Sequence, residues 1–148
     1  MVKPSSIAVS VTSSVPTKPP WGEPYLRFGL AFFMVVIGIA HFTHGAQFLP
    51  AMPPYLLPRH HLLLIHVSGF FEILGGLGIA LPAGDRTGFL RRAAGFGLIA
   101  LYVAVFPANL YLATSQQAFL GAPNWAAWAR LPFQLLLIGW AYRYARGG

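Results

Sequence analysis

The sequence contains no cysteine, and only 9% of its 148 residues are charged. The absence of cysteine excludes disulfides, thiolate metal sites and a cysteine nucleophile. A soluble domain normally has about a quarter of its residues charged, because even a small globule must present polar surface to water. The scarcity of charge indicates that much of this chain faces lipid. The sequence therefore predicts an integral membrane protein.

Acidic residues are scarcer than basic ones, which gives the chain a formal net charge of +7. The basic residues stand between apolar segments and not along one helix face, so they do not form the stripe that a nucleic acid would bind. We therefore expect no nucleic-acid partner. The partner that the composition predicts is the lipid bilayer.

Four apolar stretches are long enough to cross a bilayer as helices, which takes about 20 residues each. They cover about 25–48, 62–81, 93–113 and 128–145. None alternates polar with apolar residues, which disfavours an outer-membrane β-barrel. The prediction is an all-α, four-transmembrane-helix bundle over residues 25–148. The segment 1–24, rich in Ser, Thr, Val and Pro, is predicted to be a disordered N-terminal tail.

The basic residues outside the spans predict the orientation of the bundle. Cytoplasmic loops of membrane proteins carry an excess of Lys and Arg. One side of the four predicted spans carries eight basic residues and the other carries two, Arg59 and Arg130. We therefore expect both termini in the cytoplasm and the proline-rich loop after the first span on the outer face.

Every predicted span contains a polar side chain in its outer half. A charge near the middle of a bilayer costs at least about 2.5 kcal/mol on insertion scales, so an ionisable group there usually has a partner and a function. Glu72 is the only acidic residue within a predicted span. The candidates for ligand binding are His41, Ser68, Glu72, Asn109, Arg130 and Gln134. Their convergence predicts an outward-facing polar pocket inside the bundle.

The chemistry of these candidates is complementary. Arg130 can neutralise Glu72 or bind an anionic or carbonyl-bearing ligand. His41 can donate, accept or shuttle a proton, so Glu72 and His41 are the candidates for acid–base catalysis. A structural interpretation competes with this one, because polar side chains also join helices in membranes and an arginine near a helix end can extend to the interface. The sequence leaves both interpretations open, as it does the protonation state of Glu72.

The two histidines of the segment IAHFTHG differ in their predicted depth. His41 is deep enough to join the pocket, whereas His44 lies a turn nearer the outer boundary and is expected at the rim. His66 lies one turn into the second span. We expect no metal site, because HxxH on a helix is a weak match without a further placed ligand.

Two residues are expected to interrupt helices. Pro107 lies two residues before Asn109 and predicts a kink in the third span, with the carbonyl of Val103 freed. Gly45 is expected to let the chain leave the first helix. Four prolines between positions 50 and 58 forbid a regular helix in the loop that follows.

Several segments together resemble the DoxX family of small bacterial membrane proteins: RFGLAFFMVVIGIAHF, FLPAMPPYLLP, HVSGFFEILGGLGIALP, FPANLYLA and RLPFQLLLIGWAY. The resemblance covers about residues 25–145, and all six ligand-binding candidates lie at matching motif positions. It implies four transmembrane helices in a bacterial inner (plasma) membrane. Some DoxX relatives are named as quinone-linked thiosulfate oxidoreductase subunits, whereas most have no established activity.

Three functions remain open at this point. The leading hypothesis is a membrane protein that binds a lipophilic ligand such as a quinone in its pocket and serves a redox or membrane-stress process. Because the chain has no cysteine and no flavin, haem or NAD motif, electron transfer would need a redox partner subunit or the quinone itself. The alternatives are an autonomous acid–base enzyme acting on a lipid-like substrate and a non-catalytic membrane scaffold. The sequence also leaves a homo-oligomer open.

Overall fold

The computed structural model describes residues 22–82, 84, 87–115 and 121–147. These residues form four α-helices: α1 (Gly22–Thr43), α2 (His61–Ala80), α3 (Gly88–Ser115) and α4 (Asn124–Ala145). Two 3₁₀ helices, η1 (Gly45–Ala51) and η2 (Pro58–His60), lie in the connection between α1 and α2. No strand occurs within the described part of the chain. The predicted all-α class is therefore confirmed.

Three helical segments are long and apolar enough to cross a membrane: Pro24–Thr43, Pro58–Ala80 and Gly88–Ser115. They correspond to the first three predicted spans. The fourth predicted span lies within α4, which has 22 residues but is not among the three. Large apolar side chains cover the outside of the helices, as Phe32 (72% exposed) and Leu136 (69% exposed) illustrate. This apolar exterior is typical of helices that face lipid.

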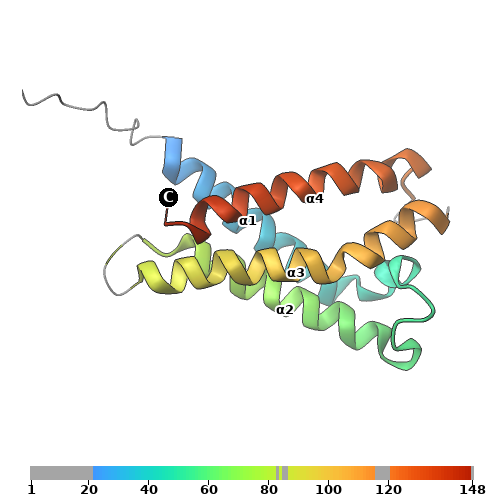
Figure 1. Ribbon diagram of the computed structural model, residues 1–148. Coiled ribbons are helices and arrows are strands. Elements are labelled where there is room, and N and C mark those ends of the chain that lie inside the picture. Colours follow the sequence, from blue (N-terminus) through green and yellow to red (C-terminus); the bar gives the residue numbers. More distant parts are fainter. Residues whose placement is uncertain (1–21, 83, 85–86, 116–120, 148) are drawn as a thin grey trace, which may run out of the picture.

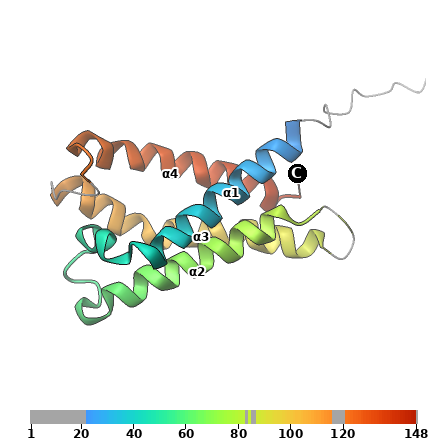
Figure 2. The same cartoon turned by 180° about the vertical axis from the view of Figure 1, so that it is seen from behind.

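The helices run along one another in two antiparallel pairs, α1 with α2 and α3 with α4 (Figures 1 and 2). α2 also packs against α3. The start of α1 and the end of α4 lie at the same end of the molecule, and η1 and η2 lie at the opposite end (Figure 1). We call these the terminal end and the loop end. Leu30, Met34, Ile79, Leu98 and Tyr144 are completely or almost completely buried and belong to one core cluster.

Glycines bring α1 and α2 into close contact near the loop end. A Cβ added at Gly69 of α2 would lie 2.6 Å from the Cβ of His41 and 2.8 Å from the carbonyl oxygen of Gly38. Real Cβ atoms do not approach other atoms this closely, so only glycine fits at this crossing. Small residues at helix crossings are typical of membrane bundles. The close approach places His41 directly beside α2.

The first predicted span extends five residues too far, because α1 ends at Thr43 and not at Phe48. The chain then turns into η1, where Gly45 is buried against α2. A Cβ at Gly45 would lie 3.0 Å from both Nε2 of His66 and Cδ1 of Leu62. Gly45 is not among the described residues with a positive φ. Gly45 therefore contributes close packing against α2 where the chain leaves α1.

The second predicted span agrees with α2 to within one residue at each end, whereas α3 begins five residues and α4 four residues before the predicted third and fourth spans. Positions 22–24 of the predicted tail are the first residues of α1, and positions 1–21 lie outside the described residues. In the proline-rich loop only the short helices η1 and η2 form. α3 continues through Pro107 and changes direction in its second half (Figure 1), as a proline within a helix predicts.

Candidate functional site

A cavity of about 540 Å³ lies between the four helices and the connection that contains η1. Sites for small molecules commonly have volumes of about 300–1,000 Å³. The lining is mainly aliphatic and aromatic, and Phe48, Ala51, Met52 and Leu56 contribute to it from the connection. The polar lining residues are His41, Ser68, Glu72, Tyr102, Asn109, Arg130 and Gln134. All six residues singled out from the sequence therefore line one cavity, and every α-helix contributes at least one.

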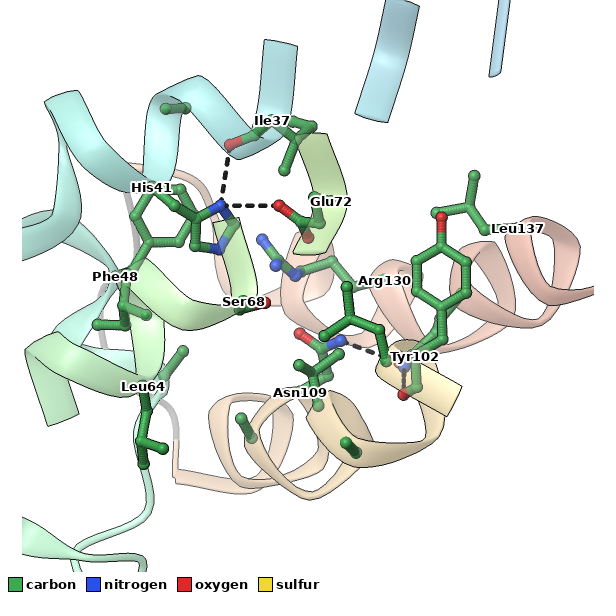
Figure 3. A pocket seen from close by; sticks show the side chains of 18 of the residues that line it. Ile37, His41, Phe48, Leu64, Ser68, Glu72, Tyr102, Asn109, Arg130 and Leu137 are labelled. Carbon is green, nitrogen blue, oxygen red and sulfur yellow. Dashed lines mark hydrogen bonds and ion pairs between the residues drawn. The ribbon is translucent and has the colours of Figure 1, made fainter. Parts of the chain in front are cut away.

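His41 of α1 and Glu72 of α2 form a close pair of ionisable groups in the cavity (Figure 3). Nδ1 of His41 lies 3.1 Å from Oε2 of Glu72 and 2.8 Å from the carbonyl oxygen of Ile37. Nδ1 carries at most one hydrogen, and the Ile37 carbonyl, which is nearer than Oε2 of Glu72, accepts the better hydrogen bond. The contact with Glu72 is therefore mainly electrostatic, and Oε2 has no full hydrogen bond within the described structure.

The imidazole of His41 is held in place on one face by Phe48. The two rings are stacked, with centroids 4.3 Å apart and an angle of 23° between their planes. The His41 side chain is 12% exposed, so only part of its edge reaches the cavity. Ser68 lies one turn before Glu72 on α2 and also lines the cavity (Figure 3).

Arg130 of α4 brings a positive charge to the same region. Its guanidinium group points toward the carboxylate of Glu72 (Figure 3). Glu72 is only 8% exposed, and a buried carboxylate is costly unless opposite charge lies nearby. The positions of Arg130 and His41 on two sides of Glu72 meet this requirement. The cavity thus holds an acid, a base and a fixed cation within a mainly apolar wall.

Gln134 and Asn109 join α4 to α3 by hydrogen bonds. Nδ2 of Asn109 donates to Oε1 of Gln134 over 2.9 Å, and Nε2 of Gln134 donates to the backbone carbonyl of Tyr102. Gln134 is 3% exposed. Both ends of this amide are therefore used within the protein, which favours a positioning role for Gln134 over direct contact with a ligand. Pro107 was expected to free the backbone carbonyl of Val103, but the Gln134 side chain bonds to the carbonyl of the neighbouring residue, Tyr102.

Tyr102 is a polar lining residue that sequence reasoning missed. Its hydroxyl donates to Sδ of Met34 over 2.8 Å, and the residue is 5% exposed. Tyr102 precedes Asn109 by seven residues, which places both on one face of a helix. This spacing could have indicated from the sequence that Tyr102 lines the same cavity as Asn109.

The other histidines lie outside the cavity lining. His44 is exposed, and its Nδ1 lies 2.7 Å from Oγ1 of its neighbour Thr43. His66 stacks on Phe42 with ring centroids 5.2 Å apart. Among the residues that the structure describes, no three His, Cys, Asp or Glu side chains come together as a metal ion would require.

The fold and this cavity define a class of small all-helical protein with three membrane-length helices and, at its loop end, a mainly apolar cavity that contains a few polar groups. Residues 30–145 match the model of one family, described as a domain of unknown function (DUF8561), and the chain belongs to this family. The matched region includes all the lining residues of the cavity. No curated protein and no solved structure matches the chain.

Proposed function

We propose that this protein spans the membrane several times and binds a lipophilic small molecule in its cavity, with a quinone as the leading candidate. The observation that carries this proposal is the cavity of about 540 Å³, whose apolar walls converge on His41, Glu72 and Arg130. An apolar pocket with a few convergent polar groups is typical of small-molecule sites. Polar groups that only join helices would not need such a space beside them, because packed interiors leave few voids larger than a water molecule.

The proposal includes α4 as a fourth transmembrane helix. Its polar residue Gln134 is buried, whereas the next two residues, Leu135 and Leu136, are 63% and 69% exposed. α4 also packs along α3, which is itself long enough to cross a membrane. The lower apolar content of α4 is thus explained by side chains that face the bundle interior. A four-helix bundle in lipid accounts for both observations.

The orientation of the bundle follows from its basic residues. The helix ends at the terminal end carry Arg27, Arg91, Arg92, Arg143 and Arg146. Near the loop end the basic residues are Arg59 and Arg130. By the positive-inside rule, the terminal end lies in the cytoplasm and the cavity opens toward the outer leaflet. The resemblance to DoxX proteins supports a bacterial inner membrane as the location.

A redox or membrane-stress process is the biological role that the DoxX resemblance favours. Arg130 would donate hydrogen bonds to a ligand oxygen, and His41 and Glu72 would handle protons. The chain has no cysteine, so electrons would pass through the ligand or a partner subunit. A second function, an autonomous acid–base enzyme, is favoured by the 3.1 Å approach of His41 to Glu72. It predicts turnover by the purified chain without an electron acceptor.

The test is ligand binding by the full chain in lipid nanodiscs, with decyl-tailed quinones as probes and empty discs as the blank. Ala108→Phe places a ring in the cavity and should abolish saturable binding. Its matched control, Ala100→Phe, changes an exposed position on the same helix that does not line the cavity. Arg130→Gln should weaken binding, whereas Arg59→Gln in η2 should not. Binding that is equal in all four variants, or absent in the wild type, would overturn the proposal.

A further inference from the structure

The two atoms that face Nδ1 of His41 determine where its hydrogen lies. One is the carbonyl oxygen of Ile37 at 2.8 Å, which can only accept a hydrogen bond. The other is Oε2 of Glu72 at 3.1 Å. A bare nitrogen lone pair facing the Ile37 carbonyl at this distance would be repelled. Nδ1 therefore carries the hydrogen, and in the neutral imidazole the other nitrogen, Nε2, is a hydrogen-bond acceptor.

Nε2 is directed away from both of these acceptors. In Figure 3 it lies on the side of the ring toward Ser68, another lining residue. Phe48 covers one face of the ring, and the Ile37 and Glu72 contacts hold its Nδ1 edge. The imidazole thus has little freedom to turn. A basic nitrogen of fixed orientation borders the cavity.

The other charged and titratable groups in the cavity lining come from the three other helices. They are Glu72 on α2, Tyr102 on α3 and Arg130 on α4. The Tyr102 hydroxyl donates to Met34, and both ends of the Gln134 amide are bonded within the protein. Nε2 of His41 therefore borders the cavity as an acceptor, near Ser68 and the positive charge of Arg130. An acceptor and a cation together suit an oxygen that carries a hydrogen.

We propose that the cavity prefers a lipophile with a weakly acidic hydroxyl on an aromatic ring, a phenol or hydroquinone, and that His41 takes its proton. This inference rests on the proposed function. The ligand O–H bond breaks as an Nε2–H bond forms, so one proton moves and no electrons are exchanged with the protein. The imidazolium then lies beside Glu72, and the phenolate oxygen lies in the field of Arg130. Of the two redox forms of a quinone ligand, the cavity would thus prefer the reduced one, because a quinone or an ether has no hydrogen to donate to Nε2.

The aromatic residues in the cavity favour a ring over an alkyl head. Phe33 and Phe133 both line the cavity and meet edge to face, with centroids 5.7 Å apart. Phe48 lines it on the His41 side. Aromatic rings pack favourably in such edge and offset arrangements. A phenol ring would lie among these side chains with its hydroxyl toward His41, and the aliphatic lining would receive the tail.

The test uses an alkyl-tailed 4-nitrophenol, whose phenolate absorbs visible light, together with its methyl ether. Both are titrated into nanodiscs that hold the full-length protein, with empty discs as the blank. The phenol should bind about tenfold or more tightly than the ether, because the ether leaves Nε2 without a donor. Bound probe should contain more phenolate than probe in empty discs at the same pH. His41→Gln should remove this gain, and the matched control His44→Gln should retain it.

The outcomes separate this inference from the proposed function. Equal binding of phenol and ether overturns the head-group inference and leaves lipophile binding standing. Binding of neither probe overturns the head-group inference, whereas saturable binding of a decyl-tailed quinone would still support the proposed function. A bound phenol with no gain in phenolate refutes the proton transfer. A measurement on the unmutated protein guards against misfolded variants: ¹⁵N spectra of histidine-labelled protein should show Nδ1–H for His41, and an Nε2–H tautomer would refute the inference.

Discussion

Replacing Gly69 by alanine should separate the two helices that bring His41 and Glu72 together. The new Cβ would lie 2.6 Å from the Cβ of His41 and 2.8 Å from the carbonyl oxygen of Gly38. Carbon atoms pack best at about 3.5–4.0 Å, so α1 and α2 would have to move apart by about 1 Å. Overpacking of this kind costs about 1–3 kcal/mol. The same movement would lengthen the 3.1 Å approach of His41 to Glu72 and weaken ligand binding.

The control for this prediction is Gly97→Ala on α3, where an added Cβ has no atom within 4 Å. Alanine in an open helical position gains about 0.5–1 kcal/mol over glycine. Gly69 also lies within a helix, so this gain is common to both variants. The two variants should therefore differ in free energy of unfolding by the overpacking cost alone, about 1–3 kcal/mol. The assay is unfolding of the detergent-solubilised protein by sodium dodecyl sulfate, followed by circular dichroism. If Gly69→Ala proves as stable as Gly97→Ala, the helices do not cross as closely as described.

Two further predictions concern the amide link and the loop. Gln134→Leu removes both hydrogen bonds of Gln134 and should lower the free energy of unfolding by about 1–3 kcal/mol in the same assay. The control Gln47→Leu changes an exposed position and should leave this free energy unchanged. Equal effects of the two variants would contradict the link between α3 and α4. Leu57 has a left-handed backbone with φ of 44°, so Leu57→Gly should raise stability by up to about 1 kcal/mol. The control Leu56→Gly removes a cavity-lining side chain and should lower stability. If Leu57→Gly also lowers stability, the backbone at Leu57 is not strained.

The composition of the cavity could be predicted from the sequence because depth along a helix follows from residue number. Each residue adds about 1.5 Å, so the spans fix which polar groups share a level. Glu72, Asn109 and Arg130 were placed together in this way, and all three line the cavity. This reasoning needs only the helix boundaries and the direction of each helix. Depth along a helix does not identify the ligand, and the binding role of these residues stays a prediction.

The partners of these side chains could not be predicted, because they depend on the rotation of each helix about its axis. Tyr102 accepts a hydrogen bond from Gln134 only because α3 and α4 turn these positions toward each other. The bonding of both ends of Gln134 makes it a link between helices, which the sequence could not distinguish from a ligand contact. The end of α1 at Thr43 likewise depends on how closely Gly45 packs against α2. Such contacts are set by tertiary packing and leave little trace in a single sequence.

The bundle separates folding from its proposed chemistry along its length. Core residues such as Leu30, Leu98 and Tyr144 hold the helices together beside the terminal end, whereas the loop end encloses a cavity. A cavity loses the contact energy that a filled core would provide, and Glu72 adds the cost of a buried carboxylate. The helices still meet closely at Gly69, which holds His41 against Glu72. A space that costs stability, bordered by an acid–base pair at 3.1 Å, supports the proposal that the cavity binds a ligand.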